Sequence, residues 1–267
     1  TFFTFYLVEN PAGSVRAERS WSSWTYYWAG TTADQRNYGQ WMVGSCAVGC
    51  GPVAWMMLLG WVDIKSTYPQ VTGQVWKRWN AYRENGSSTG IATTGAGIAP
   101  QATWTSSGGT LTMTTGAGVY TSTEYIRNQV GTFCFAGSGA TYPSSMDGIR
   151  NYLNYVGTGM SFDTHYNAVG YHEDRLRDYA IEHLTKSNAS DRRPVIIGTG
   201  WLNHYPLAYG YAWRSRPTTW RDAGWWVGDD VVYSRFFYVN NGHGGSGGGG
   251  DNGWVGAGTW FAGRVSP

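Results

Sequence analysis

Charged side chains are scarce in this chain. Lys, Arg, Asp and Glu make up 13% of the 267 residues, where a soluble domain usually has about 25%. The 19 basic and 17 acidic residues leave a net charge of +2, and no basic run is present. We therefore expect neither nucleic acid nor an anionic membrane surface as a partner.

Long apolar runs are missing as well. None approaches the ~18 residues of a membrane-spanning helix, so we expect no membrane insertion. The chain opens on Thr1 and shows no signal-peptide pattern. We expect a mature, secreted form from which a targeting segment or propeptide has been removed, or a trimmed chain.

Cysteine is rare, with only Cys46, Cys50 and Cys134. In a secreted protein, an odd number indicates one disulfide and one free thiol. The economical pairing joins Cys46 to Cys134 and leaves Cys50 free. Three thiols at these spacings match no common zinc site, and we expect neither a metal nor a cofactor.

Aromatic residues and glycine are abundant, with 16 Trp, 19 Tyr and 39 Gly. This composition, combined with low charge, is associated with secreted microbial hydrolases and lectins. Apolar periodicity changes from helical in the first half to strand-like in the second, which predicts an α+β protein of two lobes. The predicted helices cover 50–61, 75–83, 146–155 and 172–186, and the predicted strands cover 195–200, 204–211 and 236–241.

The most informative stretch begins at Cys50. Pro52 suits the first turn of a helix, and residues 53–59 are apolar on every side, which predicts a buried helix. Cys50 would stand at its N-terminus, where unpaired N–H groups and the helix dipole favour a thiolate. We therefore predict a nucleophile, although the same pattern fits a structural cysteine in a core helix.

A cysteine nucleophile needs a base and a group that orients the base. His204 begins an apolar stretch about 150 residues after Cys50, and Asn240 and Asn241 end a later strand. This order and spacing are those of papain-type enzymes. Taken singly, His204 fits a core histidine, and the two asparagines fit turn residues.

The stretches around Cys50, His204 and Asn240 resemble those of papain-like cysteine peptidases, most of all the streptopain branch and bacterial relatives with a Gly-Cys-Gly-Pro helix start. In that branch the nucleophile opens a helix with small residues in its first turns and an aromatic residue at its end. Cys50, Ala54 and Trp61 hold these places. The family's histidine strand closes on a Gly-aromatic pair, matched here by 210–211. The tryptophans that shield the family's His–Asn contact are replaced by Asn241 and His243.

The resemblance implies a single papain-like catalytic domain over 1–267, with a helix-rich lobe at about 30–160 and a strand-rich lobe at about 161–267. A buried helix carrying the cysteine would pack on an antiparallel sheet carrying histidine and asparagine. It implies Cys50 as nucleophile, His204 as base and Asn240 as orienting residue, with Asn241 as the alternative. Cys46 would match the disulfide cysteine that precedes papain's nucleophile, and the reverse assignment makes Cys46 the nucleophile.

In the family, the backbone N–H of the nucleophile and the side chain of an upstream glutamine hold the oxyanion. The resemblance implies that this glutamine is Gln35 or, alternatively, Gln40. The implied activity is that of a secreted cysteine endopeptidase, a hydrolase that cleaves protein or peptide through a thioester. Two other classes remain open. One is a related thiol amidase or transpeptidase that acts on cell-wall peptide. The other is a carbohydrate-binding protein without activity, in which aromatic rings stack on sugars and Cys50 is structural.

Overall fold

The computed structural model describes residues 20–30, 38–66, 104–107, 110–113, 117–155, 161–166, 173–199, 204–222, 225–243, 252–257 and 261–266. Within these residues, helices combine with antiparallel sheets, which confirms the α+β prediction. No helix of this part of the chain is long and apolar enough to cross a membrane.

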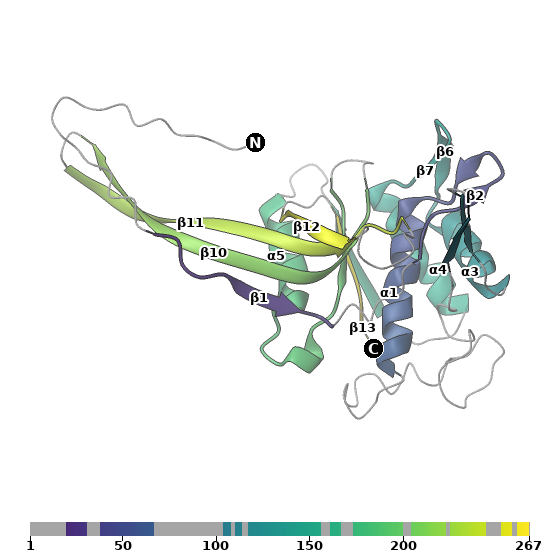
Figure 1. Ribbon diagram of the computed structural model, residues 1–267, viewed down its shortest axis with the longest axis horizontal. Helices are drawn as coiled ribbons and strands as arrows, with labels where there is room; N and C mark the ends of the chain where they lie inside the picture. Colours follow the sequence, from purple (N-terminus) through teal and green to yellow (C-terminus); the bar gives the residue numbers. More distant parts are fainter. Residues whose placement is uncertain are drawn as a thin grey trace.

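One large antiparallel sheet organises the fold (Figure 1). Its strands lie in the order β12 (Asn252–Gly256), β11 (Trp225–Asn240), β10 (Leu207–Asp222), β9 (Val195–Ile197), β13 (Phe261–Ser266) and β8 (Ser161–Tyr166). A seventh strand, β1 (Thr25–Trp28), pairs with β10 beyond the end of β9. The strands β10 and β11 have 16 residues each and form a hairpin that projects from the rest of the molecule.

The sheet separates two helices. Helix α1 (Cys50–Ser66) covers one face, and α5 (Glu173–Leu184) covers the other. Alternation along β9 shows the division, because Ile196 packs in the core around α1, whereas Val195 and Ile197 pack against α5. Residues 51–62 of α1 are all buried, as its apolar sequence predicts.

Smaller elements pack on α1 from the side away from the sheet. These are α3 (Ala117–Gln129), the 3-10 helix η3 (Pro143–Gly148) and α4 (Ile149–Tyr155), which complete the core around α1. This part of the chain also contains three short two-stranded hairpins: β2 (Met42–Val43) with β3 (Cys46–Ala47), β4 (Trp104–Ser107) with β5 (Thr110–Met113), and β6 (Phe133–Phe135) with β7 (Ser138–Ala140). A further 3-10 turn, η4 (Ala189–Asp191), follows α5.

Comparison with the expected elements shows where the sequence pattern is informative. The helices expected at 50–61 and 172–186 are α1 and α5, and the one expected at 146–155 is divided into η3 and α4. The strands expected at 204–211 and 236–241 belong to β10 and β11, which extend much farther, because the outer part of this hairpin carries no regular apolar alternation. The helix expected at 75–83 lies outside the described residues.

The disulfide expected between Cys46 and Cys134 is present. It joins β3, just before α1, to β6, and Cys50 is the free cysteine. A covalent link across a long loop limits the freedom of the unfolded chain and stabilises the fold by that means. The link therefore fixes the entry to α1 against the β6–β7 hairpin.

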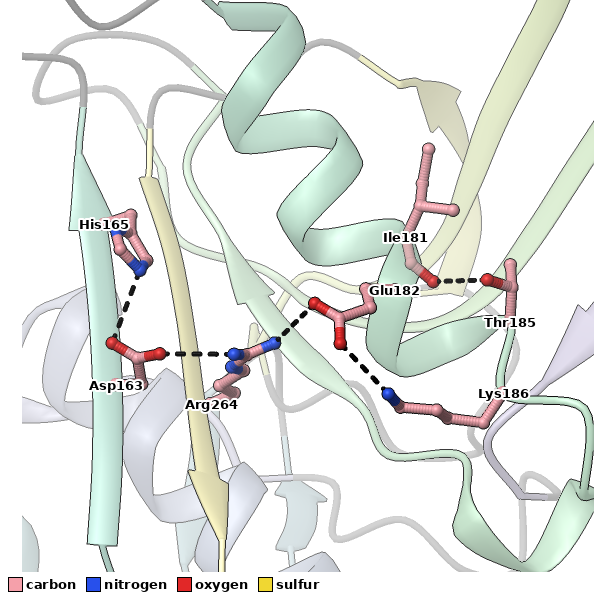
Figure 2. Close-up of polar contacts among 7 residues, drawn as sticks. All are labelled: Asp163, His165, Ile181, Glu182, Thr185, Lys186 and Arg264. Atoms are coloured by element: carbon pink, nitrogen blue, oxygen red, sulfur yellow. Dashed lines mark hydrogen bonds and ion pairs between the residues drawn. The ribbon is translucent and has the colours of Figure 1, made fainter.

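An ion-pair network ties the far edge of the sheet to α5 (Figure 2). Arg264 of β13 lies between two carboxylates, 3.2 Å from Asp163 of β8 and 3.4 Å from Glu182 of α5. Its guanidinium carbon also lies 3.8 Å from the centre of the Tyr179 ring. Partial burial raises the pKa of Asp163, but a hydrogen bond from Tyr179 and the charges of His165 and Arg264 outweigh it and hold this pKa below its usual value.

The pKa of Glu182 is also lowered, by its hydrogen bond from Lys186 and by the positive charge of Arg264. Both carboxylates therefore contribute stability above their unfolded pKa values and lose it as the pH falls through the folded ones. We predict that Arg264→Met lowers the free energy of unfolding near neutral pH by about 1–2 kcal/mol. The difference from wild type should shrink below about pH 4, since only the contact with Tyr179 is independent of pH.

Urea unfolding of wild type and Arg264→Met, at neutral pH and below about pH 4, measures the difference in the free energy of unfolding. Arg175→Met is the matched control, because Arg175 is an exposed arginine of α5, the helix that carries Glu182. A difference that stays the same at both pH values would show that the ion pairs do not contribute.

Candidate active site

Cys50 is the first residue of α1; the residue is partly buried, and its thiol is not in a disulfide. The sequence predicts a lowered thiol pKa at this helix end. In the structure, burial raises the pKa of Cys50 above its ordinary value, while backbone hydrogen bonds from Tyr205, from Cys50 itself and from Gly51 act in the opposite direction. The helix start therefore offsets only part of the effect of burial, and a thiolate here needs a cationic partner.

The start of α1 is packed so closely that it requires glycine. A Cβ on Gly51 would lie 2.8 Å from Oγ1 of Thr141 and 3.0 Å from Sδ of Met146. A Cβ on Gly139 of β7 would collide with the carbonyl oxygen of Ala47. The hairpin β6–β7 thus lies directly against the backbone that leads into Cys50.

Tyr205 joins this region to the segment before β10. Its buried hydroxyl donates a hydrogen bond of 3.0 Å to the carbonyl oxygen of Thr141. The hydroxyl of Thr141 in turn lies 2.7 Å from that of Thr132. The backbone of Tyr205 contacts the thiol of Cys50. The residue that follows His204 is therefore fixed beside the predicted nucleophile.

The ring of His204 is held by the loop that follows β11. Its Nε2 lies 2.7 Å from the carbonyl oxygen of Asn241, and the ring of His243 stacks on it with centres 5.1 Å apart. A carbonyl oxygen only accepts hydrogen bonds, so Nε2 must carry the proton. In the neutral ring, Nδ1 is then the basic nitrogen.

Asn240 has a different position from the one that the resemblance implies. It is buried at the end of β11, and its Oδ1 accepts a hydrogen bond of 2.8 Å from the N–H of Gly242, which closes a tight turn. Among the described hydrogen bonds, it is the main chain of Asn241 that contacts the imidazole of His204, not the side chain of Asn240. Asn240 therefore shapes the turn that presents this carbonyl.

The turn after Asn240 rests on α1. Gly242 has φ +71°, and a Cβ there would lie 3.0 Å from Cγ1 of Val53 and 3.1 Å from Cε of Met57. Glycine is needed both for this backbone conformation and for the close approach. The helix that begins with Cys50 thus also supports the loop that holds His204.

The predicted oxyanion donor Gln35 lies outside the described residues. The alternative, Gln40, lies between the buried Tyr38 and Trp41, whose carbonyl oxygen accepts a hydrogen bond of 2.8 Å from the N–H of Val48. Gln40 therefore belongs to a segment that runs beside the approach to Cys50. The alternative nucleophile Cys46 has no free thiol, because it is bonded to Cys134.

Sequence reasoning missed the residues that assemble this region. Thr141 and the carbonyl of Asn241 act through the main chain, which leaves no pattern in side-chain types. Tyr205 directly follows His204 but reads as one more core aromatic. Among the described residues, no group of three or more His, Cys, Asp or Glu side chains is placed to hold a metal ion. Comparison with family models, with curated proteins and with solved structures gave no match.

Removal of the Tyr205 hydroxyl tests its connecting role. We predict that Tyr205→Phe lowers the free energy of unfolding by about 1–2 kcal/mol, because it removes a hydrogen bond from a buried carbonyl. Urea unfolding measures the change. The control is Tyr142→Phe, which removes an exposed hydroxyl. Equal stability of the two variants would contradict the proposed role of Tyr205.

Proposed function

We propose that the protein is a secreted cysteine peptidase that hydrolyses peptide bonds, with Cys50 as nucleophile and His204 as base. One observation carries the proposal. The free thiol of Cys50, at the start of the buried helix α1, contacts the backbone of Tyr205. Tyr205 directly follows His204, whose Nε2 is hydrogen-bonded to the carbonyl oxygen of Asn241. The proposal includes a papain-like two-lobe fold, in which α1 forms one wall of the site and the ends of β10 and β11 form the other.

In the first half of the reaction, Nδ1 of His204 takes the proton of the Cys50 thiol, and the sulfur attacks the carbonyl carbon of the substrate. The C–N bond then breaks, and the imidazolium protonates the leaving amine. Because burial alone keeps the thiol protonated, transfer to His204 is what produces the nucleophile. The carbonyl of Asn241 accepts the Nε2–H bond before and after this transfer, so the ring keeps its orientation.

In the second half, His204 takes a proton from water, whose oxygen attacks the thioester. The C–S bond breaks, the carboxylic acid leaves, and the proton returns to the sulfur. The backbone N–H of Cys50 and the side chain of Gln35 or Gln40 hold the oxyanion in both halves. Loss of one such donor commonly costs about 100-fold or more in rate.

A related thiol amidase or transpeptidase acting on cell-wall peptide is the second candidate. The abundance of aromatic residues, with 16 Trp and 19 Tyr, favours it, because aromatic rings also bind glycans. Hydrolysis of casein but not of peptidoglycan supports the first candidate, and the reverse supports the second. A carbohydrate-binding protein without activity would leave Cys50 unreactive and sugar binding unchanged in Cys50→Ala.

Alkylation by iodoacetamide at mildly acidic and neutral pH, followed by peptide mapping, tests the nucleophile. We predict a single label on Cys50, attached faster than to an ordinary free thiol. His204→Ala should remove this advantage and shift labelling to alkaline pH, because only a thiol of raised pKa remains. Cys50→Ala is the control and should take up no label. Labelling of wild type no faster than that of a free thiol would end the peptidase proposal.

The role of Asn240 is tested by a pair of variants. Asn240→Ala removes the acceptor that closes the turn, and we predict that kcat falls about 10- to 100-fold through misplacement of His204. Asn240→Asp keeps an oxygen for the N–H of Gly242 and should retain most of the activity. If both variants lose activity equally, the side chain of Asn240 has a role other than closing the turn.

A further inference from the structure

A pocket lies on the outer part of the large sheet. It has a volume of about 200 Å³ and is lined by Trp24, Tyr26, Ala212, Phe236 and Trp254, which we call the aromatic pocket. Ala212 pairs with Tyr26 on one side and with Phe236 on the other. A methyl group between two large rings leaves a hollow. The rings remain accessible, with Tyr26 52% and Trp254 41% exposed.

The aromatic pocket opens on the face of the sheet that is turned away from α5. The neighbouring residues Tyr211 and Phe237 pack in the core beneath α5, so Ala212 and Phe236 point to the opposite face. Leu207 and Ile196 in the same sheet pack against α1. The pocket therefore lies on the side of the sheet that α1 covers farther along, which is also the side of the candidate active site.

The rings of the pocket are not coplanar. Trp24 and Phe236 meet at 58° with centres 5.7 Å apart, and Tyr26 and Trp254 meet at 58° with centres 5.9 Å apart. Tilted rings form the walls of a slot rather than the flat platform on which a sugar ring stacks. Slots between aromatic rings are the sites at which proline-containing peptides dock, since their conformation is already extended when free.

Positive charge lies beside the slot. Arg214 is two residues beyond Ala212 on the same face of β10, and its guanidinium carbon is 4.5 Å from the ring centre of Trp24 and 4.7 Å from that of Trp21. Among the described residues, Arg214 has no acidic partner. A guanidinium that stacks through its faces keeps its N–H donors at the edge, where they match a carboxylate. The charge complements an acidic residue next to the inserted ring.

The pocket and the candidate active site are both served by strand β11. Phe236 precedes Asn240 by four residues on the same strand, a distance of about 13 Å. Tyr238 lies between them and contacts Trp254, with ring centres 5.0 Å apart. An extended peptide covers such a distance with about four residues.

We propose that the aromatic pocket is a substrate subsite that holds a proline beside an acidic residue, about four or more residues from the bond that Cys50 cleaves. The subsite deepens the proposed peptidase function and rests on it. The occupant is the polypeptide substrate itself, in an extended conformation. Its acidic side chain pairs with Arg214, and its proline ring enters the slot.

Binding to the full chain carrying Cys50→Ala tests the subsite without cleavage. The probes are a peptide of alternating Glu and Pro, the same peptide with Gln in place of Glu, and chitin and peptidoglycan oligosaccharides, each followed by calorimetry. We expect the Glu-Pro peptide to bind at least 10-fold more tightly than the Gln-Pro peptide. Trp254→Ala should weaken its binding at least 10-fold, and Arg214→Gln should abolish the preference for Glu. The control Phe135→Ala removes an exposed ring far from the pocket and should change nothing.

Peptide binding that neither Trp254→Ala nor Arg214→Gln alters would overturn the proposal, and so would oligosaccharide binding that depends on Trp254 in the absence of peptide binding. Circular dichroism checks that each variant is folded. The result is independent of the alkylation of Cys50. A reactive Cys50 without peptide binding removes only the subsite, whereas specific peptide binding with an unreactive Cys50 removes the catalytic proposal and leaves a peptide-binding pocket that is not a substrate subsite.

Discussion

The contact between the start of α1 and the end of β7 is the constraint on which the candidate site depends. Gly139 lets the backbone of β7 approach that of Ala47 and Gly49 to a distance that no side chain would allow, and Gly51 leaves room for the side chain of Thr141. The side chain of Thr141 can then pack on Gly51, while the carbonyl oxygen of Thr141 accepts a hydrogen bond from the hydroxyl of Tyr205. A chain of contacts thus runs from the residue after Cys50 to the residue after His204. Each step involves either glycine or a buried hydrogen bond, so each tolerates little displacement.

Two opposing influences act on the thiol of Cys50. Burial favours the neutral form, and the hydrogen bonds of the helix start favour the thiolate, with burial the stronger. A nucleophile in this environment depends on its base, because proton transfer to an imidazole replaces one buried charge by a pair. The orientation of His204 is secured by a main-chain carbonyl, which has no protonation state of its own at ordinary pH. The environment favours a thiol that becomes reactive only with its partner in place.

The sequence predicts those features that depend on side-chain type and periodicity. The all-round apolar run after Pro52 locates α1, and the odd number of cysteines points to the pair Cys46–Cys134. The sequence also singles out Cys50, His204 and Asn240. It assigns the hydrogen bond to the imidazole of His204 to the side chain of Asn240, whereas the main-chain carbonyl of Asn241 makes it. Main-chain contacts leave no compositional trace. The length of the β10–β11 hairpin escapes prediction for a related reason, since its outer part is held by the main-chain ladder between the two strands.

The place of β13 in the sheet has a consequence for the synthesis of the chain. This strand comes after β8 and β9 in the sequence, yet it lies between them in the sheet, and it carries core residues such as Phe261. Until residues 261–266 have left the ribosome, β9 lacks one of its two neighbours, and the surface beneath α1 has a gap. Strand β9 is therefore paired on both sides only late in the synthesis of the chain. Growing chains would carry the thiol of Cys50 well before the sheet beneath α1 is complete.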